Sequence, residues 1–171
     1  MKKQIDFLCA YTQWASELMW QALRQLSDEQ WREPQDYSVG SVCEQITHVM
    51  YASMRWLSML QLSDNRPEFS AEDFPTVASA EERWHEIWIE IYQYLFILDQ
   101  EDLEEEIVWG PTSKGLAGET PRWQLISHMM NHVTDHRTQV FMLINTQYGI
   151  QTPEKDMIFY IMREEKRVWA A

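Results

Sequence analysis

Residues 121–147 have the sequence PRWQLISHMMNHVTDHRTQVFMLINTQ, and this stretch decides the fold that we predict. It follows Thr120, a common helix N-cap residue, and Pro121 suits the first position of a helix. Gly149 comes just after its end, where glycine commonly caps a helix. The stretch therefore predicts a long helix from Pro121 to about Gln147, and this helix contains three of the five histidines.

Two earlier segments also carry clear helix signals. Residues 4–26 place apolar side chains at spacings of three and four, the pattern of a helix with one buried face. These side chains are Ile5, Leu8, Tyr11, Ala15, Leu18, Met19, Ala22 and Leu26. Ser41 and Glu44 form a capping-box pattern, which predicts a second helix that runs to about Leu62.

The remaining signals complete an all-α fold. A second capping-box pattern at 79–82 predicts a third helix to about Asp99, and Thr152-Pro153-Glu154 predicts a fifth helix that continues to the C-terminus. Glycine and proline cluster within 104–119 around a short β-prone run, so we expect a short loop or small hairpin there. We predict one domain, residues 1–171: a four-helix bundle with an additional C-terminal helix. The long connection after the second helix leaves an up-down-down-up arrangement open.

Composition and charge exclude several functions. The chain has 27 acidic and 14 basic residues, a net charge of −13, so we expect no binding to nucleic acids or anionic membranes. No apolar run approaches the roughly 20 residues that span a bilayer. No signal peptide is recognisable, and we predict a cytoplasmic protein. Cys9 and Cys43 lie in amphipathic segments and are expected to be buried thiols outside any disulfide framework.

His128, His132 and His136 stand at spacings of four within the long helix. Each step of four residues advances about 40° around the helix axis, so adjacent members lie one above the other. Histidines at i and i+4 can share one ion with bonds of about 2.0–2.1 Å. Histidines at i and i+8 are about 12 Å apart along the axis. Spacing therefore allows two of the three to bind one metal and leaves open which two, and the pattern also arises by chance.

His48 is the candidate third ligand, because it lies among apolar residues in the second helix. A histidine in such a place is more often a hydrogen-bonded core residue than a ligand. Inward-facing histidines on two separate helices are nevertheless explained most simply by one shared ion. His85 is expected to be a surface or partly packed histidine with no further ligands near it.

Two motifs resemble those of the DinB-like, damage-inducible proteins of the DinB/YfiT-like superfamily. They are Gln45-Ile46-Thr47-His48-Val49 and His128-Met129-Met130-Asn131-His132-Val133-Thr134-Asp135-His136-Arg137-Thr138-Gln139. Residues 11–15 and 26–29 also fit the N-terminal pattern of that family, so the resemblance extends over most of the chain. It implies a metal-binding helical bundle.

The resemblance further implies a ligand set of His48, His132 and His136. His128 corresponds to a frequent extra histidine that is not a ligand in the family pattern. Thr138 is a departure, since a glycine usually follows the His-Arg pair. The resemblance also implies a homodimer and a role in stress response, without DNA contact or polymerase activity.

Three neutral imidazoles leave a divalent ion with at least one open position, which is typical of catalytic sites. Bound water there has a pKa lowered to around 7, and a thiol would bind as thiolate. We expect zinc or nickel, with iron as an alternative, because all three suit imidazole. No general base other than the metal-bound water stands out.

Residues around the predicted ligands have weaker assignments. Glu44 and His128 are candidates to support the ligands from behind. Glu44 lies one turn before His48 and would orient its ring unless helix capping occupies it. Asn131 and Asp135 point about 100° away from the ligands that follow them, so we expect them to face solvent or another helix.

Two classes of function fit these features. The first is a metal-dependent hydrolase or thiol-dependent transferase that acts on a small molecule, with a low-molecular-weight thiol as candidate partner. It predicts an open metal site with a pocket at the end of the bundle. The alternative is a metal-stabilised, non-catalytic structural or interaction protein, which would be homodimeric. A vestigial, empty site is the third hypothesis.

Overall fold

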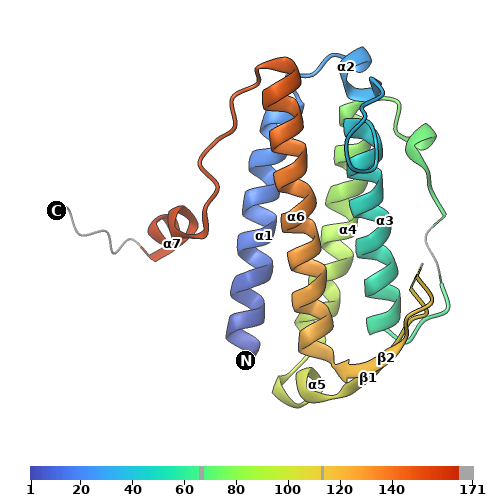
Figure 1. The fold of residues 1–171 in the computed structure, drawn as a ribbon. Helices are drawn as coiled ribbons and strands as arrows, with labels where there is room; N and C mark the ends of the chain where they lie inside the picture. The colour runs from blue at the N-terminus through green and yellow to red at the C-terminus, as the bar shows by residue number, and fades with distance from the viewer. Residues whose placement is uncertain (66–67, 113, 166–171) are drawn as a thin grey trace.

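The computed structural model describes residues 1–65, 68–112 and 114–165. Four long helices stand side by side in a bundle (Figure 1). They are α1 (Lys2–Leu23), α3 (Val42–Leu60), α4 (Val77–Ile97) and α6 (Arg122–Tyr148). The predicted all-α class and four-helix bundle are confirmed.

The helices contact one another around a square. Both α1 and α3 pack against α6 and against α4. α1 and α6 run in one direction, and α3 and α4 run in the other (Figure 1). The connection between α3 and α4, which contains the 3-10 helix η1 (Ala71–Asp73), returns the chain along the length of the bundle. The arrangement is therefore up-down-down-up, and it places the predicted ligands of α3 and α6 on neighbouring helices.

Reciprocal side-chain caps set the starts of α3 and α4. The backbone N–H of Ser41 donates to the Glu44 carboxylate at 2.7 Å, which confirms the capping box predicted before α3. The capping box predicted at 79–82 is wrong. Thr76 caps α4, and its hydroxyl accepts from the backbone N–H of Ser79 at 3.2 Å. The helix begins earlier because Val77, at 7% exposure, belongs to the core.

A small hairpin precedes α6. The sequence had left open whether this segment forms a loop or a hairpin. β1 (Glu106–Trp109) pairs antiparallel with β2 (Gly118–Pro121). Because pairing continues to Pro121, Thr120 lies in a strand and the predicted Thr120 cap is wrong. Pro121 is itself the N-cap residue, and α6 starts one residue later than expected. Its predicted end is confirmed, since Gly149 adopts a left-handed conformation with φ of 68°.

Short helices close the two ends of the bundle. α2 (Asp28–Arg32) follows α1, which ends at Leu23 and not at the predicted Leu26. α5 (Gln100–Glu104) follows α4. Both were missed in the sequence, because five residues are too few to show an apolar period.

The additional C-terminal helix exists but starts later than predicted. α7 (Met157–Glu165) begins after an extended stretch that includes 152–154, where we expected its first turn. Pro153 and its neighbours continue the extended linker from α6. α7 lies beside α1 and away from the other helices (Figure 1). The predicted continuation over 166–171 lies outside the described residues.

Aromatic side chains fill much of the core. Trp20, Trp31, Trp84 and Trp88 are at most 2% exposed. Trp20 and Trp84 meet edge to face across α1 and α4, with ring centroids 6.0 Å apart. Such large buried rings fix the separation of these helices and thus the frame that holds the histidines.

Within the described ranges, every helix is too short or too polar to cross a membrane.

Candidate metal centre

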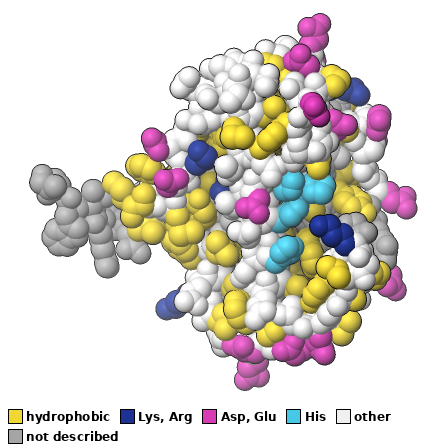
Figure 2. Space-filling model, viewed as in Figure 1, with side chains coloured by type: hydrophobic (Ala, Val, Ile, Leu, Met, Phe, Trp, Pro, Cys, Tyr) yellow, Lys and Arg dark blue, Asp and Glu magenta, His cyan; other side chains and the backbone are white. Residues whose placement is uncertain are grey.

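The three predicted ligands meet on one side of the bundle. His48 lies in α3, and His132 and His136 lie near the middle of α6, which packs against α3. The ring centroids of His132 and His136 are 4.5 Å apart. The His48 centroid is 4.7 Å from that of His136 and 5.3 Å from that of His132. Figure 2 shows the histidines as one patch in the middle of this face, with hydrophobic side chains and a basic side chain beside it.

The three rings fit a single ion. One nitrogen of each ring lies within 4.8 Å of the other two. An ion with bonds of about 2.1 Å at tetrahedral angles needs nitrogens roughly 3.4 Å apart, which small ring rotations provide. All three side chains are half-buried, so the point between them is open to solvent. In the part of the chain that the structure describes, the rings of His48 and His132 accept and donate no hydrogen bond, and only those of His85 and His136 have partners.

Protonation is disfavoured at all three rings. Burial, together with the neighbouring His136, His48 and His128, lowers the pKa of His132 to about 4. Burial also lowers the pKa of His48. For His136, burial and the His48 charge outweigh the opposite effect of Asp135, and the pKa is lowered. Neutral imidazole is the form that binds metals, so the rings are prepared for a cation near neutral pH.

Gln45 orients one ligand, and sequence reasoning missed it. Its amide nitrogen donates to the Tyr37 carbonyl at 3.2 Å, which turns the amide oxygen toward Nδ1 of His136 at 3.4 Å. The pairing favours a proton on Nδ1 and leaves Nε2 of His136 for an ion. Gln45 is fully buried. Its partner lies on another helix, 91 residues away, so no spacing in the sequence indicated this role.

The two supporting residues proposed from the sequence have other contacts. The Glu44 carboxylate accepts from both the backbone N–H and the hydroxyl of Ser41 at 2.7 Å, so capping occupies it. His128 is exposed and meets Trp56 edge on, with centroids 4.7 Å apart. Its centroid is 6.3 Å from that of His132, and it lies outside the group of three.

The other α6 residues near the ligands behave as expected. Asn131 and Asp135 are exposed and bond to each other at 3.3 Å. Thr138, in place of the usual glycine, is exposed and bonds to the carbonyl of Thr134 in its own helix. The departure from the family pattern therefore leaves the packing of α6 against α3 undisturbed.

Arg137 anchors α6 from behind the ligands, a role that the sequence did not suggest. It is 3% exposed and donates to the Thr12 carbonyl of α1 at 3.2 Å. Its guanidinium lies 5.5 Å from the centroid of the Tyr11 ring, and burial lowers its pKa. Because Arg137 faces α1, the preceding His136, about 100° around the helix, is held on the side that faces α3.

Two neighbouring cavities extend from the histidines along α3. One, of about 330 Å³, is lined by His48, Tyr51, Ala52, Arg55, Trp56, Met59 and Thr112. The other, of about 500 Å³, is lined by Trp56, Trp109, Thr112, Leu116, Glu119, Thr120, Gln124, Leu125 and His128. They share Trp56 and Thr112, and we call them together the histidine groove. The sequence predicted a pocket at the end of the bundle. The histidine groove instead runs along the side of the bundle, from its middle to the hairpin.

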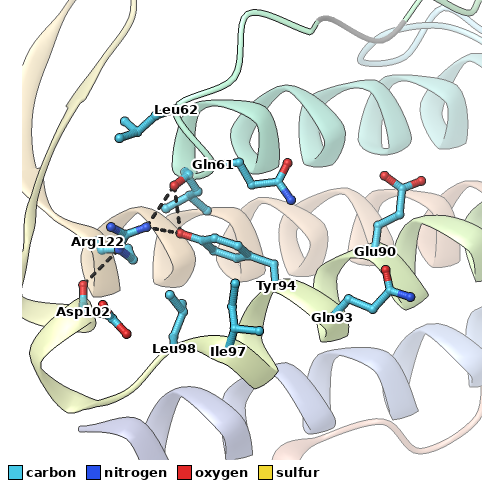
Figure 3. A pocket seen from close by; sticks show the side chains of 10 residues that line it. Gln61, Leu62, Glu90, Gln93, Tyr94, Ile97, Leu98, Asp102 and Arg122 are labelled. Carbon is cyan, nitrogen blue, oxygen red and sulfur yellow. Dashed lines mark hydrogen bonds between the residues drawn. The ribbon is translucent and has the colours of Figure 1, made fainter.

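A larger cavity of about 550 Å³ lies elsewhere, between the C-terminal parts of α3 and α4 (Figure 3). At its α6 end, the polar groups around Arg122 already bind one another. Arg122 is 7% exposed and donates to Tyr94, Glu105 and the carbonyls of Leu60 and Asp102. We call this group the Arg122 corner, and its saturated contacts indicate a structural role.

His85 has more neighbours than the sequence suggested, and that expectation is corrected. Its Nε2 lies 3.2 Å from the Glu17 carboxylate of α1, and Glu81 completes a group of three within 4.8 Å. Glu81 is already paired with Arg24, whose Nε lies 3.0 Å from it. The group is therefore an ion-pair network that joins α1 and α4.

Both cysteines are buried and free, as predicted. Burial raises the pKa of the Cys9 thiol to about 12. The Cys43 thiol contacts the carbonyls of Ala71 and Phe74 and does not approach the histidines.

Comparison with known proteins identifies the family of the chain and two solved structures with a similar fold. The family model described as "DinB family" matches residues 1–168. A conserved protein of locus from Enterococcus faecalis has a similar structure, with a TM-score of 0.64 at 13% identity, covering 84% of this chain and 96% of its own. A DinB-like protein from Bacillus cereus ATCC 10987 has a TM-score of 0.64 at 18% identity, covering 86% and 94%. No curated protein matches the sequence. The family match over nearly the whole length shows that the chain belongs to the DinB family.

Proposed function

We propose that this chain is a metal-dependent enzyme that holds one divalent ion on His48, His132 and His136 and acts on a small molecule, as a hydrolase or a thiol-dependent transferase. The observation that carries the proposal is the solvent-open meeting point of three neutral, half-buried imidazoles beside a groove. A structural zinc site normally has four protein ligands, whereas three ligands leave room for a reactant.

The bound ion would supply Lewis-acid chemistry, lowering the pKa of water or of a thiol in the open position. Zinc and nickel are the expected metals, with iron as an alternative. The chain itself would position the reactants. Gln45 holds the His136 ring in one orientation, and Arg137 fixes the rotation of α6 against α1. The groove beside His48 would seat the substrate and limit access of bulk water.

The first test is elemental analysis of the purified protein, followed by activity screens. We expect about one equivalent of metal in the wild type and almost none in His132→Ala. His128→Ala, one turn away on the same helix, is the matched control and should keep its metal. Metal-loaded protein should hydrolyse an activated ester or transfer a low-molecular-weight thiol to an electrophile, and His132→Ala should lack this activity.

Two results would contradict the proposal. Wild-type protein that stays metal-free in excess zinc, nickel and iron(II) would show a vestigial site. Metal-loaded protein without turnover, but with a strongly raised melting temperature, would favour a metal-stabilised structural protein instead.

One observation favours this second function, a homodimeric interaction protein. α7 exposes Met157, Ile158, Phe159 and Met162, which are between 36% and 55% exposed. An apolar face of this kind is typical of a contact with another chain. A dimer in light scattering that Ile158→Ser with Phe159→Ser converts to monomer would support it; a wild-type monomer would exclude it. The cytoplasmic location and the stress-response role remain predictions.

A further inference from the structure

The groove beside the histidines contains an arginine without an acidic partner. Arg55 lies in α3 and lines the smaller cavity together with His48. Its guanidinium donates to the carbonyl of Pro111 in the hairpin. A guanidinium has five N–H donors, so most remain available. Among the described residues, no carboxylate lies within ion-pair distance of Arg55, although Asp64 borders an adjacent cavity that Arg55 also lines.

Arg55 differs from several other arginines of this chain, which has 27 acidic and 14 basic residues. Arg24, Arg83 and Arg122 each pair with a glutamate. Arg55 instead borders a cavity in which no other described residue is charged. An anionic group would find there a cation that is half-shielded from solvent and not already paired.

Helix geometry sets the distance between Arg55 and the ion site. His48, Ala52, Arg55 and Met59 line the cavity from one face of α3. Seven residues separate His48 from Arg55, a rise of about 10 Å. A ligand that reaches both ends therefore needs an elongated body with one metal-binding group and one anionic group.

The walls between these ends suit an apolar, flat body. Trp56 is half-buried, and its ring lies edge on to His128 at 4.7 Å and 6.4 Å from the Trp109 ring. Trp109 fits because residue 118 lacks a side chain: a Cβ at Gly118 would lie 2.8 Å from the indole. Beyond Trp56, the larger cavity contains Glu119, which would repel an anion. The anionic group therefore belongs at Arg55, on the near side of Trp56.

From these contacts we propose that the substrate is a small organic anion with an aromatic or apolar body, whose carboxylate or similar group binds Arg55 while its other end reaches the ion. The proposal rests on the proposed metal site and adds the substrate class. Arg55 is a specificity-determining residue in this scheme, and Trp56 supplies the flat contact.

The test compares two rigid thiols on the full-length protein loaded with Co²⁺. 4-(Mercaptomethyl)benzoate carries the carboxylate, and 4-(mercaptomethyl)benzamide is its neutral counterpart. A thiolate-to-cobalt charge-transfer band reports metal binding by either compound and yields its Kd. We expect the benzoate to bind about tenfold more tightly than the amide, as for a charge-assisted hydrogen bond.

Variants assign the preference to Arg55. Arg55→Gln should weaken benzoate binding about tenfold, leave amide binding and cobalt content unchanged, and bring the ratio near one. Arg83→Gln is the matched control, because Arg83 lies in α4, pairs with Glu86, and lines neither cavity of the histidine groove. It should keep the wild-type ratio.

The outcomes separate this proposal from the metal site. A band with equal Kd values for both thiols in wild type, or an unchanged ratio in Arg55→Gln, overturns the role of Arg55 and leaves the metal site standing. If no band forms, the proposed metal site fails. Quenching of tryptophan fluorescence then measures the same ratio, and a benzoate preference that Arg55→Gln removes would still support the anion site.

Discussion

Two polar clusters of this bundle differ in how completely their atoms are paired. In the Arg122 corner, one buried guanidinium reaches two backbone carbonyls, a tyrosine hydroxyl and a carboxylate. At the metal centre, two of three half-buried imidazoles have no partner among the described residues, and Arg55 nearby makes one contact with Pro111. The first cluster ties α3, α4, α5 and α6 together. The second lies beside an open groove.

The difference separates a structural cluster from a binding cluster. Buried polar groups are normally hydrogen-bonded, because an unpaired one costs about 1–3 kcal/mol. The Arg122 guanidinium, whose neighbours meet this demand internally, has little left to offer a ligand, although the cavity beside it is larger than either single cavity of the histidine groove. A group of imidazoles that leaves the demand unmet still has nitrogens free to bind an ion. Cavity size alone does not reveal this difference.

We expect the largest effect on stability from removing Arg122, which tests the contrast between the two clusters. Arg122→Met removes the guanidinium that donates to the Tyr94 hydroxyl, the Glu105 carboxylate and the Leu60 and Asp102 carbonyls, so we expect unfolding free energy to fall by about 2–4 kcal/mol. Urea unfolding of metal-free protein measures the loss. His132→Ala under the same conditions should change stability by less than about 1 kcal/mol. Equal losses in the two variants would remove the distinction between the clusters.

Added metal should make the histidines matter for stability as well. Zinc at about 100 times its Kd should stabilise the wild type by about 2.7 kcal/mol, because the ion binds the folded chain alone. EDTA should remove this increment. His48→Ala takes away the one ligand from α3 and should show no response to either. A zinc-dependent increment that persists in His48→Ala would mean that the ion binds elsewhere.

A substitution of Gln45 tests whether this residue supports metal binding without being a ligand. Gln45→Leu replaces the amide with an apolar side chain of similar size and leaves Nδ1 of His136 without its acceptor. Loss of such a support typically weakens metal affinity about tenfold or more, so we expect a tenfold higher Kd for zinc with all three ligands intact. Competition with a chelating dye measures the Kd, and metal-free stability is recorded in parallel. An unchanged Kd would show that Gln45 serves packing alone.

The smallest expected effect concerns pH. Burial lowers the pKa of His132 to about 4 from 6.5 in an open chain. Between these values the unfolded chain binds more protons than the folded one, so metal-free protein should lose stability as pH falls through this window. Below about pH 4 the ring is protonated in both states, so His132 causes no further loss of stability there. Urea unfolding of EDTA-treated protein at pH 7, 6 and 5 should give a shallower slope for His132→Ala. A slope as steep as that of the wild type would contradict the lowered pKa.

Much of the fold was predictable from local patterns. The capping box at Ser41, the apolar stripe of 4–26 and the C-cap at Gly149 depend on neighbours within a few residues, and each was recognised with errors of a few positions. Errors occurred where a distant contact outweighed the local signal. Hairpin pairing drew Thr120 into β2, and burial of Val77 moved the start of α4 to Thr76.

For the metal centre, spacing allowed two of the three histidines in α6, and the family pattern selected His132 and His136. The structure brings these two together with His48 and leaves His128 against Trp56. Gln45 and Arg137 lay within the quoted motifs, yet their roles were not apparent. Their partners are remote: 91 residues separate Gln45 from His136, and 125 separate Arg137 from Thr12.

The sequence by itself determined the helical class, the approximate extent of the long helices and the i,i+4 pairing of the candidate ligands in α6, because apolar period, caps and i,i+4 spacing act within one helix. The tertiary structure alone decided the up-down-down-up order and which helices are neighbours. That order sets α3 beside α6, joins His48 to the α6 pair and aligns Arg55, Trp56 and the hairpin into one groove. Such juxtapositions depend on how whole helices pack, and no local pattern contains them.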